Sequence, residues 1–341
     1  MHKVLIVGGA AIWAIETYYC KYLNQLGLPT EIFNCSAYYD STSLLFKIRN
    51  RAGDKGIYTT VNIELIKYCI QARPEIVWVF KGIEIYSETL LKLKQLGIIL
   101  VNYNPDHPFI RTSISHGGKN IPESVPLYDL HFSYRKDLIN EIKVKYNIPA
   151  VLLPFGFELA DNDFERIKDV PENNSICFIG TPDKERVQII ALIANAGYAV
   201  DIYGQQYQHR HILNKYKNIK SFGLVLGLDY WKKVREYRIQ LNFFRQHNID
   251  SHNQRSFEVP GAGGILLSPD SIDQRDYFAA EKEMFFFKDK YELLYQIETI
   301  STRPKDEIKN IREASRRRSL LSGYSYKDRA SVVFETFKLL K

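Results

Sequence analysis

The stretch from Leu241 to Leu267 combines charged side chains with closely spaced glycines. A predicted strand ends at Asn242, a polar loop follows, and the segment from Arg255 to Glu258 opens a short helix that stops at Gly261. A guanidinium offers a fork of donors to phosphate oxygens, and a carboxylate accepts hydrogen bonds from two neighbouring hydroxyls. This stretch therefore has the chemistry to bind a molecule that carries both groups.

A second candidate phosphate site follows the apolar run from Ser175 to Ile179. Gly180 would let the backbone approach a ligand closely, and the hydroxyl of Thr181 can donate a hydrogen bond. Arg186 can pair with a diphosphate oxygen if its side chain turns inward. The alternative is an ordinary helix N-terminus with an exposed arginine.

The loop Gly8-Gly9-Ala10-Ala11 follows the first predicted strand and precedes a helix. It lacks the spaced third glycine of the G-x-G-x-x-G pattern, and the next strand ends at Asn34 rather than in an acidic residue that could bind ribose. These two departures argue against a dinucleotide cofactor. Gly8 and Gly9 either form a simple tight turn or contact an acceptor or donor.

Several segments of the C-terminal half resemble the spore-maturation CgeB-like group of glycosyltransferases, whose C-terminal domains look like those of the group-one transferases with the GT-B fold. In the first half, only NPDHP (Asn104 to Pro108) resembles this group. The matching C-terminal segments are FIGTPDKER (Phe178 to Arg186), VDIYG (Val200 to Gly204), LNFFR (Leu241 to Arg245), RSFEVPGAGGILLS (Arg255 to Ser268), YFAAEKEMFFFKDKYELLYQI (Tyr277 to Ile297) and GYSYKDR (Gly323 to Arg329).

The resemblance implies that Glu258 holds the ribose hydroxyls of a nucleotide-sugar donor and that Arg255 lies near its diphosphate. Gly263 and Gly264 would leave space for the nucleotide. Other residues of the matching segments are implied to bind the donor as well, namely Tyr203, Gly204, Asn242 and Phe257. The alternative is that Glu258 caps its helix and pairs with Arg255.

Two positions differ from the pattern of related enzymes. Related retaining transferases place two glutamates eight positions apart, whereas the residue eight before Glu258 is Asp250. Retention of stereochemistry is therefore only suggested. The closing segment often has histidine where this chain has Tyr324.

An inverting transferase needs a general base, and Asp106 and His107 follow the predicted strand that ends at Asn102. An aspartate beside a histidine can fix the tautomer of the imidazole. We predict these two residues as catalytic, with ordinary turn chemistry as the alternative. His116 is a second, weaker candidate near an acceptor.

Short apolar runs alternate with amphipathic stretches along the chain, which predicts parallel sheets of β-α repeats. The predicted strands include Ile76 to Phe80, Leu130 to Ser133 and Val200 to Tyr203. We expect an α/β protein of the GT-B type, with two Rossmann-like doubly wound domains facing each other across a cleft. The predicted domains are 1–155 for the acceptor, 156–320 for the donor, and a helix over 321–341 that packs back on the first domain. The polar stretch from Pro154 to Asn174 is predicted to be a linker.

The composition fits an ordinary folded protein of 341 residues with a formal net charge of +7. No apolar run approaches the ~20 residues that cross a bilayer, and no secretory signal is evident, so we expect a cytoplasmic protein. The four cysteines show no C-x-x-C pair. The basic run Arg316-Arg317-Arg318 is predicted to be a solvated helix face, with anionic-lipid or acceptor contact as the alternative.

Other patterns carry less weight. Asp161-Asn-Asp163 matches a metal-binding D-x-D pattern but falls in the predicted linker, and His209 and His211 have no third ligand nearby. We therefore predict no metal and no cofactor. The absence of a nucleophile elbow and of a P-loop lysine argues against the corresponding hydrolases and kinases.

The sequence thus predicts a metal-independent glycosyltransferase that uses a nucleoside-diphosphate sugar. Its acceptor would be a glycan, a protein or a small molecule, and nucleic acid is not expected as a partner. Peripheral membrane contact through the basic surface stays open. The alternatives are a nucleotide-sugar epimerase of the same fold and a non-catalytic protein that binds nucleotide sugars.

Overall fold

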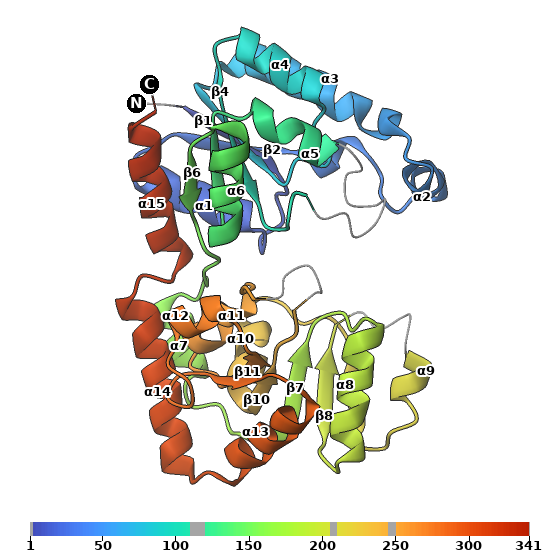
Figure 1. The fold of residues 1–341 in the computed structure, drawn as a ribbon, viewed down its shortest axis with the longest axis vertical. Helices are drawn as coiled ribbons and strands as arrows, with labels where there is room; N and C mark the ends of the chain where they lie inside the picture. The colour runs from blue at the N-terminus through green and yellow to red at the C-terminus, as the bar shows by residue number, and fades with distance from the viewer. Residues whose placement is uncertain (1–2, 110–119, 205–209, 245–249, 341) are drawn as a thin grey trace. The chain divides into compact units, whose positions relative to one another are not determined.

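The computed structural model describes residues 3–109, 120–204, 210–244 and 250–340. The chain forms two compact units (Figure 1). Unit 1 comprises Met1–Pro154 together with Tyr326–Lys341, and unit 2 comprises Phe155–Ser325. No helix in the described ranges is long and apolar enough to cross a membrane.

Unit 1 contains a six-stranded parallel sheet in the order β2-β1-β3-β4-β5-β6. The all-apolar sequence of β3 and its complete burial are typical of a central strand that is covered on both faces. The strands are β1 (Val4–Gly8), β2 (Thr30–Asn34), β3 (Ile76–Phe80), β4 (Ile99–Asn104), β5 (Leu130–Ser133) and β6 (Ala150–Leu152).

Helices cover both faces of this sheet (Figure 1). Tyr19 of α1 and Phe337 of α15 are buried in the core on one face, and Leu65 of α3 and Leu90 of α4 are buried on the other. The helices are α1 (Ile15–Gln25), α2 (Leu44–Arg51), α3 (Thr59–Ala72), α4 (Ser87–Gln95), α5 (Asn120–Ser124), α6 (Lys136–Tyr146) and α15 (Tyr326–Lys338), with 3-10 turns η1 (Cys35–Tyr38), η2 (Lys55–Tyr58) and η3 (Val125–Leu127).

Unit 2 contains a second six-stranded parallel sheet in the order β12-β11-β10-β7-β8-β9. Its strands are β7 (Asn173–Ile179), β8 (Val200–Tyr203), β9 (Ile219–Phe222), β10 (Tyr237–Leu241), β11 (Leu266–Pro269) and β12 (Phe285–Phe287). Its helices are α7 (Asp161–Ile167), α8 (Lys184–Asn195), α9 (Arg210–Leu213), α10 (Gly227–Glu236), α11 (Arg255–Gly261), α12 (Ile272–Tyr277), α13 (Lys290–Thr302) and α14 (Lys305–Leu321).

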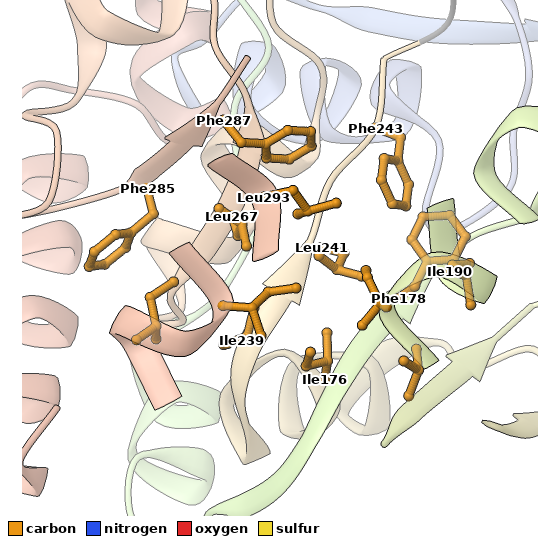
Figure 2. Packing of buried hydrophobic residues seen from close by; sticks show 14 of the residues in the cluster. Ile176, Phe178, Ile190, Ile239, Leu241, Phe243, Leu267, Phe285, Phe287 and Leu293 are labelled. Carbon is orange, nitrogen blue, oxygen red and sulfur yellow. The ribbon is translucent and has the colours of Figure 1, made fainter. Parts of the chain in front are cut away.

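The core of unit 2 joins its strands to α8 and α13. Figure 2 shows Ile239 and Leu241 of β10 close to Leu267 of β11 and Leu293 of α13, and all four side chains are buried. Full burial of one such side chain contributes about 1.5 to 3 kcal/mol to the free energy of unfolding. This packing fixes the strand ends from which the polar side chains of the next section extend.

The two doubly wound units confirm the predicted α/β class. One local prediction was wrong, because the stretch from Pro154 to Asn174 is not a linker. It contains α7, and Phe155, Phe157 and Ile167 are buried. The polar residues that suggested a linker lie in this short helix, in the segment that follows it and at the start of β7.

Candidate functional site

The strand order of unit 2 changes direction between β7 and β10, and ligands of doubly wound sheets bind beyond the strand ends at such a point. Arg186 connects the two strand ends. Its Nη1 donates to the carbonyl of Thr181 at 3.1 Å, and its Nη2 donates to the carbonyl of Phe243 at 3.4 Å. Arg186 thus turns inward, as the predicted role requires, and these two donors hold backbone on both sides of the switch point.

Gly180 and Gly204 bring the ends of β7 and β8 into close contact. A β-carbon on Gly204 would lie 2.5 Å from the carbonyl oxygen of Gly180, and Gly204 has a φ of 137° that favours glycine. The amide of Gly180 donates to the carbonyl of Tyr203 at 2.8 Å. The close contact of the two strands therefore requires glycine at position 204. Gly180 also has no side chain between its backbone and α11.

Arg255 lies beside that bare backbone. Its Nη2 is 3.7 Å from the position that a β-carbon on Gly180 would occupy. Its Nε is buried and has no hydrogen-bond partner among the described residues. The structure thus brings together two residues that the sequence separates by seventy-five positions, and it places a guanidinium with spare donor capacity at the switch point.

Glu258 follows Arg255 by one turn of α11. Its Oε2 accepts a 2.6 Å hydrogen bond from the hydroxyl of Tyr230, and its Oε1 accepts one of 2.8 Å from Nε2 of Gln254. Burial raises the pKa of Glu258, while the charge of Arg255 and these two hydrogen bonds oppose that rise. Neither oxygen bonds the helix backbone or forms an ion pair with Arg255 within the described ranges, so the capping alternative is not what holds this carboxylate.

Sequence reasoning missed both partners of Glu258. Gln254 lies four positions earlier on the same helix face, a spacing that could have revealed the pair. Tyr230 lies on α10, and no local pattern in the sequence links it to Glu258.

Asn242 supports the loop that leads to α11. It is buried, and its side-chain amide exchanges hydrogen bonds of 3.2 and 2.8 Å with that of Asn253. It also donates to Oγ of Ser268 at 3.1 Å, and Ser268 and Ser256 both donate to Gln274. Asn242 therefore acts through this buried network in the structure, and direct contact with a donor stays a prediction.

Phe257 and Tyr203 point into the protein interior. The ring of Phe257 is buried among those of His252, Tyr277 and Tyr324. The hydroxyl of Tyr203 shares a 2.8 Å hydrogen bond with the hydroxyl of Tyr237. Both predicted donor-binding side chains thus pack against the protein's own residues.

Gly263 and Gly264 lie at the far end of α11. A β-carbon on Gly263 would approach the carbonyl of Arg312 at 3.3 Å, and one on Gly264 would lie 2.8 Å from Val259 and 3.0 Å from the carbonyl of Val234. The backbone and side chains of α10 and α11 thus fill the space at Gly264, whereas Gly263 faces α14. A contact of either glycine with a nucleotide stays a prediction. Their small size has a packing reason that the resemblance did not indicate.

In unit 1, the loop after β1 is held by Glu16. The amide of Gly9 donates to Oε1 of Glu16 at 3.0 Å, and a β-carbon on Gly8 would lie 2.7 Å from the same oxygen. Burial raises the pKa of Glu16, with a further contribution from the nearby Glu84. Sequence reasoning missed Glu16, although its place in the first turn of the helix after a glycine-rich loop was visible.

Asp106 and His107 follow β4, as predicted. Oδ2 of Asp106 forms a 2.6 Å ion pair with Nζ of Lys81, which follows β3. Nδ1 of His107 accepts a hydrogen bond from the amide of Phe109 at 3.3 Å, so Nε2 carries the proton of the neutral imidazole. The catalytic role of both residues stays a prediction, and His116 lies outside the described residues.

The residues weighed as metal ligands that the structure describes are on α7 and α9. Asp161 and Asp163 are in the first turn of α7, where Asp163 pairs with Arg166. His211 is in α9, and His209 lies outside the described residues. Within the part of the chain that the structure describes, no group of three or more potential ligands could hold a metal ion.

Comparisons with known proteins agree with the fold. Residues 186–335 match the profile of a family described as "Glycosyl transferase-like". No curated protein matches the chain significantly.

Among solved structures, a glycosyltransferase from Rickettsia africae has a TM-score of 0.68 at 13% identity, covering 99% of this chain and 98% of that chain. HepE of Anabaena, solved in complex with UDP and glucose, has a TM-score of 0.67 at 10% identity and covers both chains completely. UDP-GlcNAc 2-epimerase from Neisseria meningitidis, bound to UDP-GlcNAc, has a TM-score of 0.60 at 15% identity, covering 98% and 99%. At these identities the likeness concerns the fold, and the chain has a glycosyltransferase-like GT-B fold.

Proposed function

We propose that this protein transfers a sugar from a nucleoside-diphosphate sugar to the hydroxyl of an acceptor. The observation that carries the proposal is the position of Arg255 beside the bare backbone of Gly180, with Glu258 one helical turn away. The family match supports it, because residues 186–335 include both Arg255 and Glu258. HepE, which shares the fold, binds UDP.

The donor diphosphate would lie between Arg255 and the Gly180 loop. The terminal nitrogens of the Arg255 guanidinium suit an anion at this place, because Nη2 lies beside Gly180. As the bond to the sugar breaks, negative charge grows on the departing diphosphate, and the guanidinium offsets it. The proposed reaction therefore relies on this cation rather than on a metal ion.

The ribose hydroxyls would bind Glu258. Each of its oxygens already accepts one hydrogen bond, from Tyr230 or Gln254. An ionised carboxylate has about four acceptor positions, so two remain for the paired hydroxyls of a ribose. The existing hydrogen bonds fix the orientation of the carboxylate before the donor arrives.

In unit 1, Asp106 would take the proton from the acceptor hydroxyl. The ion pair with Lys81 holds its carboxylate in place. A positioned general base typically accelerates such a step by about 10² to 10⁴-fold. His107 would orient the acceptor in this proposal.

Calorimetry with paired ligands tests the donor site. Arg255→Met should remove most of the preference for UDP over uridine, which corresponds to about 1.5 to 3 kcal/mol for a hydrogen bond to a charged group. Glu258→Gln should remove the preference for UDP over 2′-deoxy-UDP and leave the preference over uridine in place. If both variants bind all three ligands like the unmodified protein, the donor site lies elsewhere.

Product analysis separates transfer from the alternatives. A transferase yields a glycosylated acceptor and free nucleoside diphosphate, whereas an epimerase yields an isomerised nucleotide sugar without any acceptor. The solved epimerase with the same fold makes this control necessary. Donor binding with neither product, across a panel of nucleotide sugars and acceptors, would favour a non-catalytic binding protein.

A further inference from the structure

Unit 2 contains a cavity of about 690 Å³ at the opposite edge of its sheet from the candidate donor site. The cavity lies between α7, the end of α10 and α14. Its lining residues Arg235 and Gly263 precede β10 and β11, whereas Gly180 and Asn242 of the candidate donor site follow their strands. The two sites are therefore distinct.

Positive charge dominates this cavity. Among the described residues, six of its twelve lining residues are basic and two, Asp169 and Glu313, are acidic. Three of the basic residues are arginines on the inner wall, Arg235, Arg312 and Arg316. The run Arg316-Arg317-Arg318 is thus not the uniformly solvated face that the sequence predicted, because the side chain of Arg316 is only 11% exposed.

Each of the three arginines is held by a backbone carbonyl. Arg235 donates to Gly263 at 2.9 Å, Arg312 donates to Tyr237 at 3.0 Å, and Arg316 donates to Gly261 at 2.6 Å. The guanidinium of Arg316 also lies over the ring of Phe164, 3.3 Å from its centre. These contacts position the guanidinium groups but do not neutralise them.

Acidic partners compensate this charge only in part. The side chain of Arg312 is 8% exposed and pairs with Glu172 at 3.3 Å, but Glu172 also pairs with Arg238 at 2.7 Å. Arg316 pairs with Asp161 at 3.7 Å, and the side chain of Asp161 is 93% exposed. The Nε atoms of Arg235 and Arg312 are buried without a hydrogen-bond partner among the described residues. Buried positive charges that are not fully paired with acidic groups lower the stability of the fold, and a bound anion would offset this cost.

The pKa values of the three arginines reflect the same imbalance. Burial lowers each of them, and for Arg312 the pKa falls to about 10. The neighbouring charge of Arg235 contributes to the lowering at both Arg312 and Arg316. A bound anion would reverse this repulsion.

The outer part of the cavity is apolar. Leu320 and Leu321 at the end of α14 line it, and they are 47% and 82% exposed. The volume lies in the range of ~300 to 1,000 Å³ that organic ligands occupy. An inorganic anion alone would leave most of this cavity unfilled and would not cover the two leucines.

We propose that this cavity binds an organic phosphate ester, with its phosphate group near Arg312, Arg316 and Arg317 and its apolar part against Leu320 and Leu321. Arginine suits this role because its planar fork matches phosphate oxygens. The ester could be the head group of a membrane lipid or a free metabolite, and the chemistry of recognition is the same for both. The proposal does not depend on the function proposed for the donor site.

Titration calorimetry of the full chain with dihexanoyl phosphatidate tests it. We expect saturable binding, and dihexanoyl phosphatidylcholine, which has no net charge, should bind at least about tenfold more weakly. The double variant Lys309→Glu/Arg317→Glu should weaken phosphatidate binding by about the same factor. Both substituted residues are exposed, so the variant should fold, which its melting temperature checks.

Lys305→Glu is the matched control. Lys305 is exposed on the same helix but does not line the cavity. It should leave phosphatidate binding unchanged, and the double variant should leave UDP binding unchanged. Absent saturation, equal binding of the phosphatidylcholine, or equal weakening by the control variant would each overturn the proposal.

Two further probes identify the source of the ester. If the ligand is a lipid head group, phosphatidylcholine vesicles that contain some phosphatidate should bind the protein in a flotation assay. The double variant should then not float with these vesicles. Binding of glycerol 3-phosphate by calorimetry without such recruitment would assign the cavity to a free metabolite. Leu321→Ser should weaken dihexanoyl phosphatidate binding several-fold and leave glycerol 3-phosphate binding unchanged, because only the former has an apolar part.

Discussion

The hydroxyl of Tyr230 donates a 2.6 Å hydrogen bond to Oε2 of Glu258, although twenty-eight residues separate them in the sequence. The contact joins α10 to α11 and fixes one oxygen of the carboxylate proposed to bind ribose. It also favours the ionised form of Glu258, because its hydrogen bond opposes the rise in pKa that burial causes.

Tyr230→Phe should therefore weaken binding of a nucleotide sugar without abolishing it. The lost hydrogen bond is worth about 0.5 to 1.5 kcal/mol, or a few-fold in affinity. Calorimetry with UDP-glucose would measure this effect. Tyr291→Phe is a suitable control because Tyr291 is 73% exposed, and equal losses in both variants would contradict the proposed role.

Affinity for UDP-glucose should fall as the pH is lowered. The pKa of Glu258 is raised above 4.5, so this carboxylate takes up a proton at a higher pH than an ordinary glutamate and then loses acceptor capacity for ribose. The same shift has the opposite effect on folding. Its contribution to stability is fully present below pH 4.5 and is lost as the pH rises through the raised pKa.

Calorimetry over a pH series would test this dependence. Glu258→Gln should bind UDP-glucose with lower affinity. Its affinity should also lack the dependence on pH that the unmodified protein shows above pH 4.5. A variant whose pH profile ran parallel to that of the unmodified protein would show that another group titrates.

Gly204→Ala should destabilise the protein by about 2 to 4 kcal/mol. The new methyl group would meet the carbonyl of Gly180 at 2.5 Å, on a backbone with a φ of 137°. Gly223, at the end of the neighbouring strand, has no atom within 4 Å of such a methyl group. Gly223→Ala should thus change stability by less than about 1 kcal/mol, and urea denaturation of the two variants would compare them.

Asp106→Asn should lower the rate of transfer by about 10² to 10⁴-fold while leaving the affinity for UDP unchanged. The substitution removes the proposed base but adds no bulk. Steady-state kinetics with a matched donor and acceptor would measure the rate, and calorimetry would measure binding. Glu88→Gln, at an exposed position of α4, provides the control. A rate for Asp106→Asn similar to that of the unmodified protein would remove this residue from the mechanism.

Much of the fold could be predicted from apolar runs. The bounds predicted for β3, β5 and β8 agree with the structure, because each is a short run between polar turns. β9 was missed, since it is an edge strand with mostly exposed residues and so lacks an apolar pattern. The helix α7 was missed for a related reason. Most of its residues are polar, and only one side of the helix is apolar.

The part of the candidate site that lies in one short segment could be predicted from the sequence. Arg255 and Glu258 stand in one short segment, and the type of each residue indicates its chemistry. The neighbours that define their environment come from distant segments, as Tyr230 and Gly180 do, and only the sheet order brings them together. Gly264 shows the influence of packing, since a β-carbon there would lie 2.8 Å from Val259 and 3.0 Å from the carbonyl of Val234.

The first unit is completed by residues from the far end of the chain. Tyr326, Val333 and Phe337 of α15 are buried in its core, yet all of unit 2 precedes them in the sequence. During synthesis, the strands of unit 1 leave the ribosome early. The face of the sheet that α15 packs on lacks this helix until unit 2 has been translated. A premature stop codon near the end of the message would therefore expose apolar surface on the part of the protein that was made first.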